Sequence, residues 1–175
     1  MAGDGSDGEG SLHYVAGVAE DERSTVAVVD GGMISGWRRQ TPSLEQLHQA
    51  VCHLHASHPG VLVAVVADPA FKHALPASDQ PRLDADIEVG AVVLAPAGTL
   101  GGFTEFLTNV ARRAAASGLR PVVVTDQSVP VALGRARMDG GRWLFDLAGS
   151  APGAGSARGS GAAPASRQRR RRSSS

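Results

Sequence analysis

The sequence has one cysteine, Cys52, and therefore cannot form an internal disulfide. Such sparing use of cysteine fits a reducing compartment. The sequence also lacks any apolar run approaching the roughly 18 residues of a membrane span. Its acidic beginning, MAGDGSDGEG, lacks the basic and then apolar order of a signal peptide. We therefore expect a soluble cytoplasmic protein without a membrane partner.

The formal net charge is zero, because 17 lysines and arginines balance 17 aspartates and glutamates. The charges are unevenly distributed, however: acids predominate before Ser24, and the residues after Ser150 include arginines but no acid. Both ends are poor in large apolar side chains, which are needed to offset the entropy lost on ordering. We expect a mostly disordered acidic segment over residues 1–23, one folded domain over 24–148, and a disordered Gly/Ala/Ser linker with an Arg-rich tail over 149–175.

Within the expected domain, apolar β-branched segments alternate with amphipathic ones. Ser43 is a suitable N-cap for a helix that ends before Pro59, and a second helix ends at Gly118. This alternation predicts an α/β fold, a doubly wound and mostly parallel sheet with helices on both faces and residues 25–30 as a central strand. The predicted strands cover residues 25–30, 61–67, 90–95, 120–126 and 142–147.

Acidic residues follow the predicted strands. Asp30, Asp68 and Asp126 each end a strand, and Glu105 lies near the start of the second helix. Because parallel strands present their carboxyl ends at one edge of a sheet, we expect these acids at the same edge. Carboxylates gathered in this way repel one another unless a hard cation such as Mg²⁺ or Mn²⁺ binds them.

The segment TVAVVDGG, residues 25–32, contains the first of these acids. Two glycines after Asp30 would allow a sharp turn and a close approach of the backbone to whatever the acid holds. The alternative is that Asp30 only caps a turn.

A zinc site is disfavoured. His48, Cys52 and His55 share one face of the first predicted helix. Consecutive turns of one helix cannot easily surround a tetrahedral ion, and no second cysteine is available to complete the site. We interpret these side chains as packing or surface residues.

Short motifs around the acids resemble the NYN ribonuclease domains of the PIN superfamily, especially the Regnase-type branch. VVDGGM resembles the family's Asp-Gly-x-Asn strand end, and APAGTLGGFTEF resembles its Pro-x-x-x-x-Gly-Gly stretch before an acid-bearing helix. VVVTDQ resembles the Ser/Thr-Asn-Asp end of the last core strand, and PASDQPRL its Thr-Asp-Gln helix start. The resemblance covers about residues 25–135.

The resemblance implies a metal-dependent endoribonuclease that hydrolyses RNA phosphodiesters with a metal-activated water. Asp30, Glu105 and Asp126 would be its catalytic, metal-binding acids, and Asp68 is an additional candidate ligand that no family motif supports. The implied cofactor is Mg²⁺ or Mn²⁺, and the implied partner is single-stranded RNA. Whether the chain also forms a homo-oligomer is left open.

The acidic motif is degenerate at two positions. Met33 stands where the family has Asn, and Thr104 replaces one member of an acidic pair.

Positively charged side chains near the expected edge would have to bind the RNA backbone. The candidates are Arg38, Arg39 and Lys72. The alternative for each is a surface charge that only aids solubility.

Two functions from different classes therefore stay open. One is a PIN/NYN-type endoribonuclease, and the other is a catalytically degenerate PIN-like domain that binds RNA or a protein partner without cutting. A P-loop enzyme is disfavoured because GTLGG lacks the required Lys-Ser/Thr, and a haloacid-type phosphatase because no second Asp lies two residues after Asp30. The arginines at 167–172 are a candidate RNA contact or an end without a role.

Overall fold

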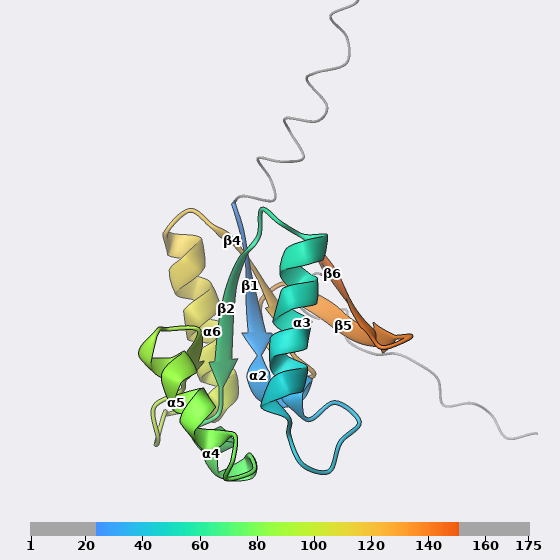
Figure 1. Cartoon of the computed structure of the whole chain (residues 1–175). Helices are drawn as coiled ribbons and strands as arrows, with labels where there is room; N and C mark the ends of the chain where they lie inside the picture. Colours follow the sequence, from blue (N-terminus) through green and yellow to red (C-terminus); the bar gives the residue numbers. More distant parts are fainter. Residues whose placement is uncertain (1–23, 151–175) are drawn as a thin grey trace, which may run out of the picture.

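The sheet is built around β1 (Thr25–Asp30), whose residues are all buried. In the computed structural model, which describes residues 24–150, six strands lie in the order β3-β2-β1-β4-β5-β6 (Figure 1). Every neighbouring pair is parallel except β5 and β6. The other strands are β2 (Leu62–Ala67), β3 (Val92–Leu94), β4 (Arg120–Val124), β5 (Leu133–Asp139) and β6 (Arg142–Ser150).

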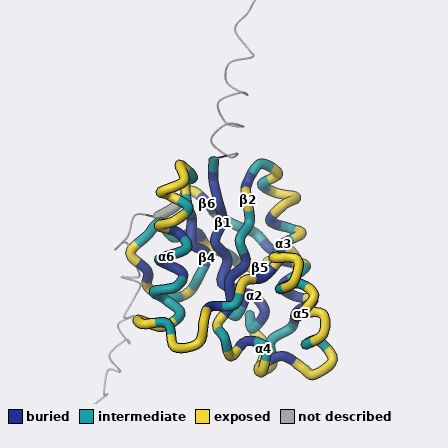
Figure 2. The backbone as a smooth tube through the Cα atoms, turned by 90° about the vertical axis from the view of Figure 1, so that its left-hand side faces the viewer, coloured by how far each residue is buried: buried dark blue, intermediate teal, exposed yellow. Residues whose placement is uncertain are grey.

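Helices cover both faces of this sheet, and Figure 2 shows β1 buried between them. One face packs against α3, where Leu47 and Leu54 meet Ala27 and Val29 in the larger apolar core. The other face packs against α6, where Leu107 lies over Val28. The helices are α2 (Gly31–Ser35), α3 (Leu44–Ser57), α4 (Phe71–Ala74), α5 (Gln80–Glu88) and α6 (Gly102–Ala116).

These observations confirm the predicted fold class, a doubly wound and mostly parallel α/β sheet. Alternate residues of β1 enter the two apolar cores, which explains why its sequence is apolar without interruption. The Ser43 hydroxyl accepts a hydrogen bond from the Gln46 backbone N–H at 3.2 Å, as expected for an N-cap. Gly118, with φ of 81°, follows the end of α6. The predictions for residues 1–23 and 151–175 lie outside the described residues.

The strand β5 was absent from the sequence prediction. Its residues alternate between exposed charged side chains and smaller inward ones, so it has no continuous apolar run. A signal was nevertheless present in the sequence Asp139-Gly140-Gly141. Both glycines have positive φ, 55° and 79°, which fits a two-residue hairpin turn between β5 and β6.

Two tryptophans join the hairpin to the rest of the domain. Trp143 of β6 is 1% exposed and meets the ring of Trp37 edge to face, with the ring centroids 5.8 Å apart. The backbone N–H of Trp143 also donates to His53 Nδ1 of α3 at 3.1 Å. The inner face of the hairpin is therefore part of the core on the α3 side.

Close packing at Gly134 of β5 yields a stability prediction. A Cβ there would lie 2.9 Å from Val122 Cγ1 and 3.0 Å from the Asp146 carbonyl oxygen. We expect Gly134→Ala to lower the free energy of unfolding by about 1–3 kcal/mol, as overpacking does. Chemical denaturation measures this loss. In the control, Gly32→Ala, the new Cβ meets only Asp30 Oδ1 at 3.4 Å, and we expect no loss. Equal stability of both variants would contradict the prediction.

Candidate active site

Asp30 is a buried carboxylate that joins three elements. It is 3% exposed. Its Oδ1 accepts a hydrogen bond from the Met33 backbone N–H at 3.0 Å, so it is the N-cap of α2. Its Oδ2 accepts from the Thr125 hydroxyl, just after β4, at 2.8 Å. Asp30 does cap a turn, as the simpler interpretation held, but it also bridges the ends of two adjacent strands.

The two glycines after Asp30 form the start of α2. Neither Gly31 nor Gly32 has positive φ, and α2 begins directly after the strand. A Cβ on Gly31 would lie 3.2 Å from Val65 Cγ1 of β2. Gly31 therefore allows α2 to begin close against the neighbouring strand, and the chain passes from strand to helix there without a positive φ.

Burial raises the pKa of Asp30 above its usual 3.8, because a charged carboxylate loses hydration there. The hydrogen bonds from Met33 and Thr125 oppose this shift, and the nearby negative charge of Asp126 adds to it. The two carboxylates therefore interact, although Asp126 is exposed and Asp30 is not. A cation bound between them would relieve both the repulsion and the loss of hydration.

The start of α6 lies over the same edge of the sheet. Asp30 is two residues beyond Val28, which packs under α6, so both side chains point to that face. The Thr104 hydroxyl of α6 donates to Gln127 Oε1, two residues after Thr125. Thr104, rather than Glu105, thus points from the helix toward the segment that bears Asp126.

Glu105 is directed along the helix surface. Its Oε1 pairs with Arg112 Nη1 at 3.3 Å, and its side chain is 43% exposed. The structure thus pairs Glu105 with a cation of its own helix. Among residues 24–150, no three His, Cys, Asp or Glu side chains are grouped closely enough to hold a metal ion.

Asp68 lies beside the site on the other flank of β1. Its Oδ1 accepts from the Ala70 backbone N–H at 2.8 Å, which closes the turn after β2. Asp68 also lines a cleft of about 150 Å³ between this turn and the start of α6, where Thr99, Gly102 and Phe103 form the opposite wall. Asp68 is exposed, and neither Asp30 nor Asp126 lines this cleft.

The three cations proposed to hold RNA have different surroundings. Arg38 is exposed and has φ of 54°. Arg39 Nε donates to Gln46 Oε1 at 2.7 Å, and the Gln46 amide in turn donates to the carbonyl oxygens of residues 34, 35 and 37. Lys72 Nζ forms an ion pair with Asp84 at 2.6 Å. Of the three, Arg38 has no ion pair or side-chain hydrogen bond within residues 24–150.

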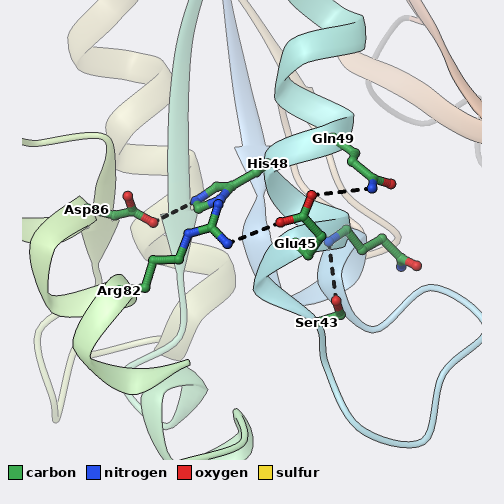
Figure 3. A network of polar contacts seen from close by, with 7 residues as sticks. Ser43, Glu45, His48, Gln49, Arg82 and Asp86 are labelled. Carbon is green, nitrogen blue, oxygen red and sulfur yellow. Dashed lines mark hydrogen bonds and ion pairs between the residues drawn. The ribbon is translucent and has the colours of Figure 1, made fainter. Parts of the chain in front are cut away.

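His48 of α3 contacts another helix. His48 Nε2 lies 2.7 Å from Asp86 Oδ2 of α5, and Glu45 pairs with Arg82 one turn away (Figure 3). Cys52 is exposed. These polar contacts join α3 to α5.

Comparison with solved structures supports the fold class. The chain is similar to the crystal structure of nuclear proteinaceous RNase P 2 (PRORP2) from A. thaliana, with a TM-score of 0.52 and 14% sequence identity. The match covers 81% of this chain and 34% of that one, so this chain spans about a third of the length of that structure. At this identity the likeness concerns the fold. No family model and no curated protein matches the chain.

Within the described part of the chain, no helix is both long and apolar enough to cross a bilayer.

The raised pKa of Asp30 predicts a pH dependence of stability. The folded protein holds this proton more tightly than the unfolded chain, so Asp30 lowers the free energy of unfolding progressively as pH rises from about 3.8 through the folded pKa. Asp30→Asn removes the titration. The variant's stability relative to the parent chain, measured in EDTA from about pH 3 to about pH 8, should therefore improve with rising pH. Asp139→Asn, on the exposed hairpin, is the control; an Asp30→Asn difference that is flat with pH would contradict the prediction.

Proposed function

We propose that the chain is a divalent-metal-dependent endoribonuclease of PIN/NYN type, acting on single-stranded RNA through the domain predicted over residues 24–148. The observation that carries the proposal is the pair Asp30 and Asp126. Asp30 ends β1 and Asp126 follows β4, the adjacent strands at which the strand order reverses, and such switch points are where open α/β sheets bind ligands. The fold likeness to a protein named RNase P and the Regnase-type motifs support the same class of function.

The donor set fits Mg²⁺ or Mn²⁺. Magnesium sites commonly use one or two carboxylates together with waters and substrate phosphates, so two acids are sufficient. Asp30 would supply a fixed oxygen, because Met33 and Thr125 already orient its carboxylate. Asp126 would supply an exposed one that a substrate can approach. A bound cation supplies an activated water and neutralises charge on the phosphate oxygens.

Other residues have supporting roles in this proposal. Asp68, at the end of the adjacent strand β2, would act as a further ligand, and so would Glu105 after release from Arg112. Arg38 would contact the RNA backbone, and Arg39 and Lys72 would do so by exchanging their present partners for phosphates.

Removal of either acid tests the activity. Asp126→Asn keeps the shape of the side chain but removes its charge, and we expect Mn²⁺-dependent cleavage of a labelled single-stranded RNA to fall by at least about 100-fold. Asp30→Asn should have the same effect, and EDTA should abolish cleavage by the parent chain. Asp139→Asn provides a control at an exposed carboxylate of the distant hairpin turn. Full cleavage by both site variants would assign the activity to a contaminant or to other residues.

A second function is favoured by specific observations. Thr104 occupies the inward position of α6 that an acid would need, and Glu105 is paired with Arg112. A site with only two interacting acids is also compatible with a domain that binds RNA without cutting it. This candidate predicts RNA binding that is unaffected by divalent cations.

Restoring an acid at Thr104 distinguishes the two candidates. Thr104→Asp should place a third carboxylate beside Asp30 and Asp126, and we expect about tenfold or more tighter Mn²⁺ binding with faster cleavage at limiting metal. The matched control is Thr104→Asn, which has the same shape without the charge. Titration calorimetry and the metal dependence of cleavage measure the two effects. Equal metal binding by the Asp and Asn variants would show that position 104 does not face the metal.

A further inference from the structure

The β5–β6 hairpin extends past the end of β4 beside the proposed site. Val124, the last residue of β4, pairs with Gly134, the second residue of β5. The rest of β5 therefore continues beyond the edge at which Asp30 lies. Arg135 is level with Thr125, which hydrogen-bonds Asp30, and β5 is two strands from β1. At about 4.8 Å for each strand spacing, β1 and β5 are roughly 10 Å apart at the last β4–β5 pair, Val124 with Gly134.

Arg135 and Arg137 lie on the face of the sheet that Asp30 shares with α6. Leu133, on the same side of β5, packs with the apolar core beneath α6. Side chains two residues apart on a strand share a face, so Leu133, Arg135 and Arg137 point the same way. The opposite face of the hairpin is occupied by the core against α3, where Met138 and Trp143 pack.

A groove of about 310 Å³ opens on the hairpin. Its residues come from both strands, and the register places Arg135 opposite Asp146 and Arg137 opposite Leu144. The lining residues are Arg135, Arg137, Leu144, Phe145 and Asp146.

The arginines in this groove are available for an anion. Both are exposed, and neither side chain has a hydrogen bond or ion pair to another residue in the range 24–150. Asp146 accepts a hydrogen bond from the Ala148 backbone N–H at 3.0 Å, and no ion pair joins it to Arg135 although the two are register partners. The Cα atoms of residues two apart on a strand are about 6.8 Å apart, so the two guanidinium groups can each contact a different phosphate of an extended chain.

We propose that Arg135 and Arg137 bind consecutive phosphates of single-stranded RNA and lead the strand along the hairpin to Asp30. This inference rests on the proposed function for its substrate class and adds a binding surface that the acidic site alone does not provide. A basic groove that follows the backbone is the usual means of binding a single strand without sequence preference. The contacts are to phosphate, so they position the strand rather than select its sequence.

Binding measurements without metal test the groove separately from cleavage. Anisotropy of a labelled oligouridine is followed in EDTA at several salt concentrations, using the full chain. We expect Arg135→Gln and Arg137→Gln each to weaken binding about tenfold at low salt and to reduce the log-log salt slope by about 0.7. Arg135→Lys and Arg137→Lys should retain the slope, because the charge is kept. A mixed-sequence RNA should lose affinity equally.

The matched control is Arg113→Gln, which removes one exposed arginine from the last turn of α6. Its affinity for RNA should stay within about twofold of that of the parent chain, and its log-log salt slope within about 0.2. The reason is that distant surface charges are screened. The proposal is overturned if the parent chain does not bind the oligouridine, if all three Gln variants behave alike, or if polyglutamate binds the groove as tightly as RNA. Loss of binding with intact Mn²⁺-dependent cleavage of a dinucleotide supports the groove and the nuclease together. Loss of binding in a chain that never cleaves supports the groove alone and refutes the proposed function.

Discussion

The buried carboxylate of Asp30 is the constraint on which the site depends. A charge at the end of a fully buried strand is unfavourable unless donors surround it, and Met33 and Thr125 supply them. Both donors belong to segments that follow a strand, so the hydrogen bonds also fix where α2 starts and where β4 ends. The hydrogen bonds that stabilise the buried carboxylate therefore also orient it toward the α6 face.

Much of this arrangement could be predicted from local sequence. The continuous apolar run of β1 indicates a strand covered on both faces, and Ser43 with Gln46 indicates the start of α3. The position of Asp30 and Asp126 at one edge follows from parallel strands ending together. These features depend on residues close in the sequence or on a general rule of topology.

Features that depend on long-range contacts could not be predicted. Glu105 and Thr104 are adjacent in the sequence, and only the long-range contact of Thr104 with Gln127 shows which of the two points toward the segment after β4. Likewise, β5 lacks an apolar run because one of its faces carries arginines, so its pairing with β4 through Gly134 became visible only in three dimensions. The pairing of Lys72 with Asp84 joins side chains twelve residues apart.

The packing of Trp37 against Trp143 makes the hairpin optically visible. The chain has only these two tryptophans, and both lie at the same contact between the segment after α2 and the inner face of β6. Intrinsic tryptophan emission therefore originates from one location, the place where the hairpin docks on the domain. Leu144, the next residue after Trp143, lines the groove on the opposite face. The protein thus contains a native spectroscopic probe, with no added label, for any displacement of the hairpin.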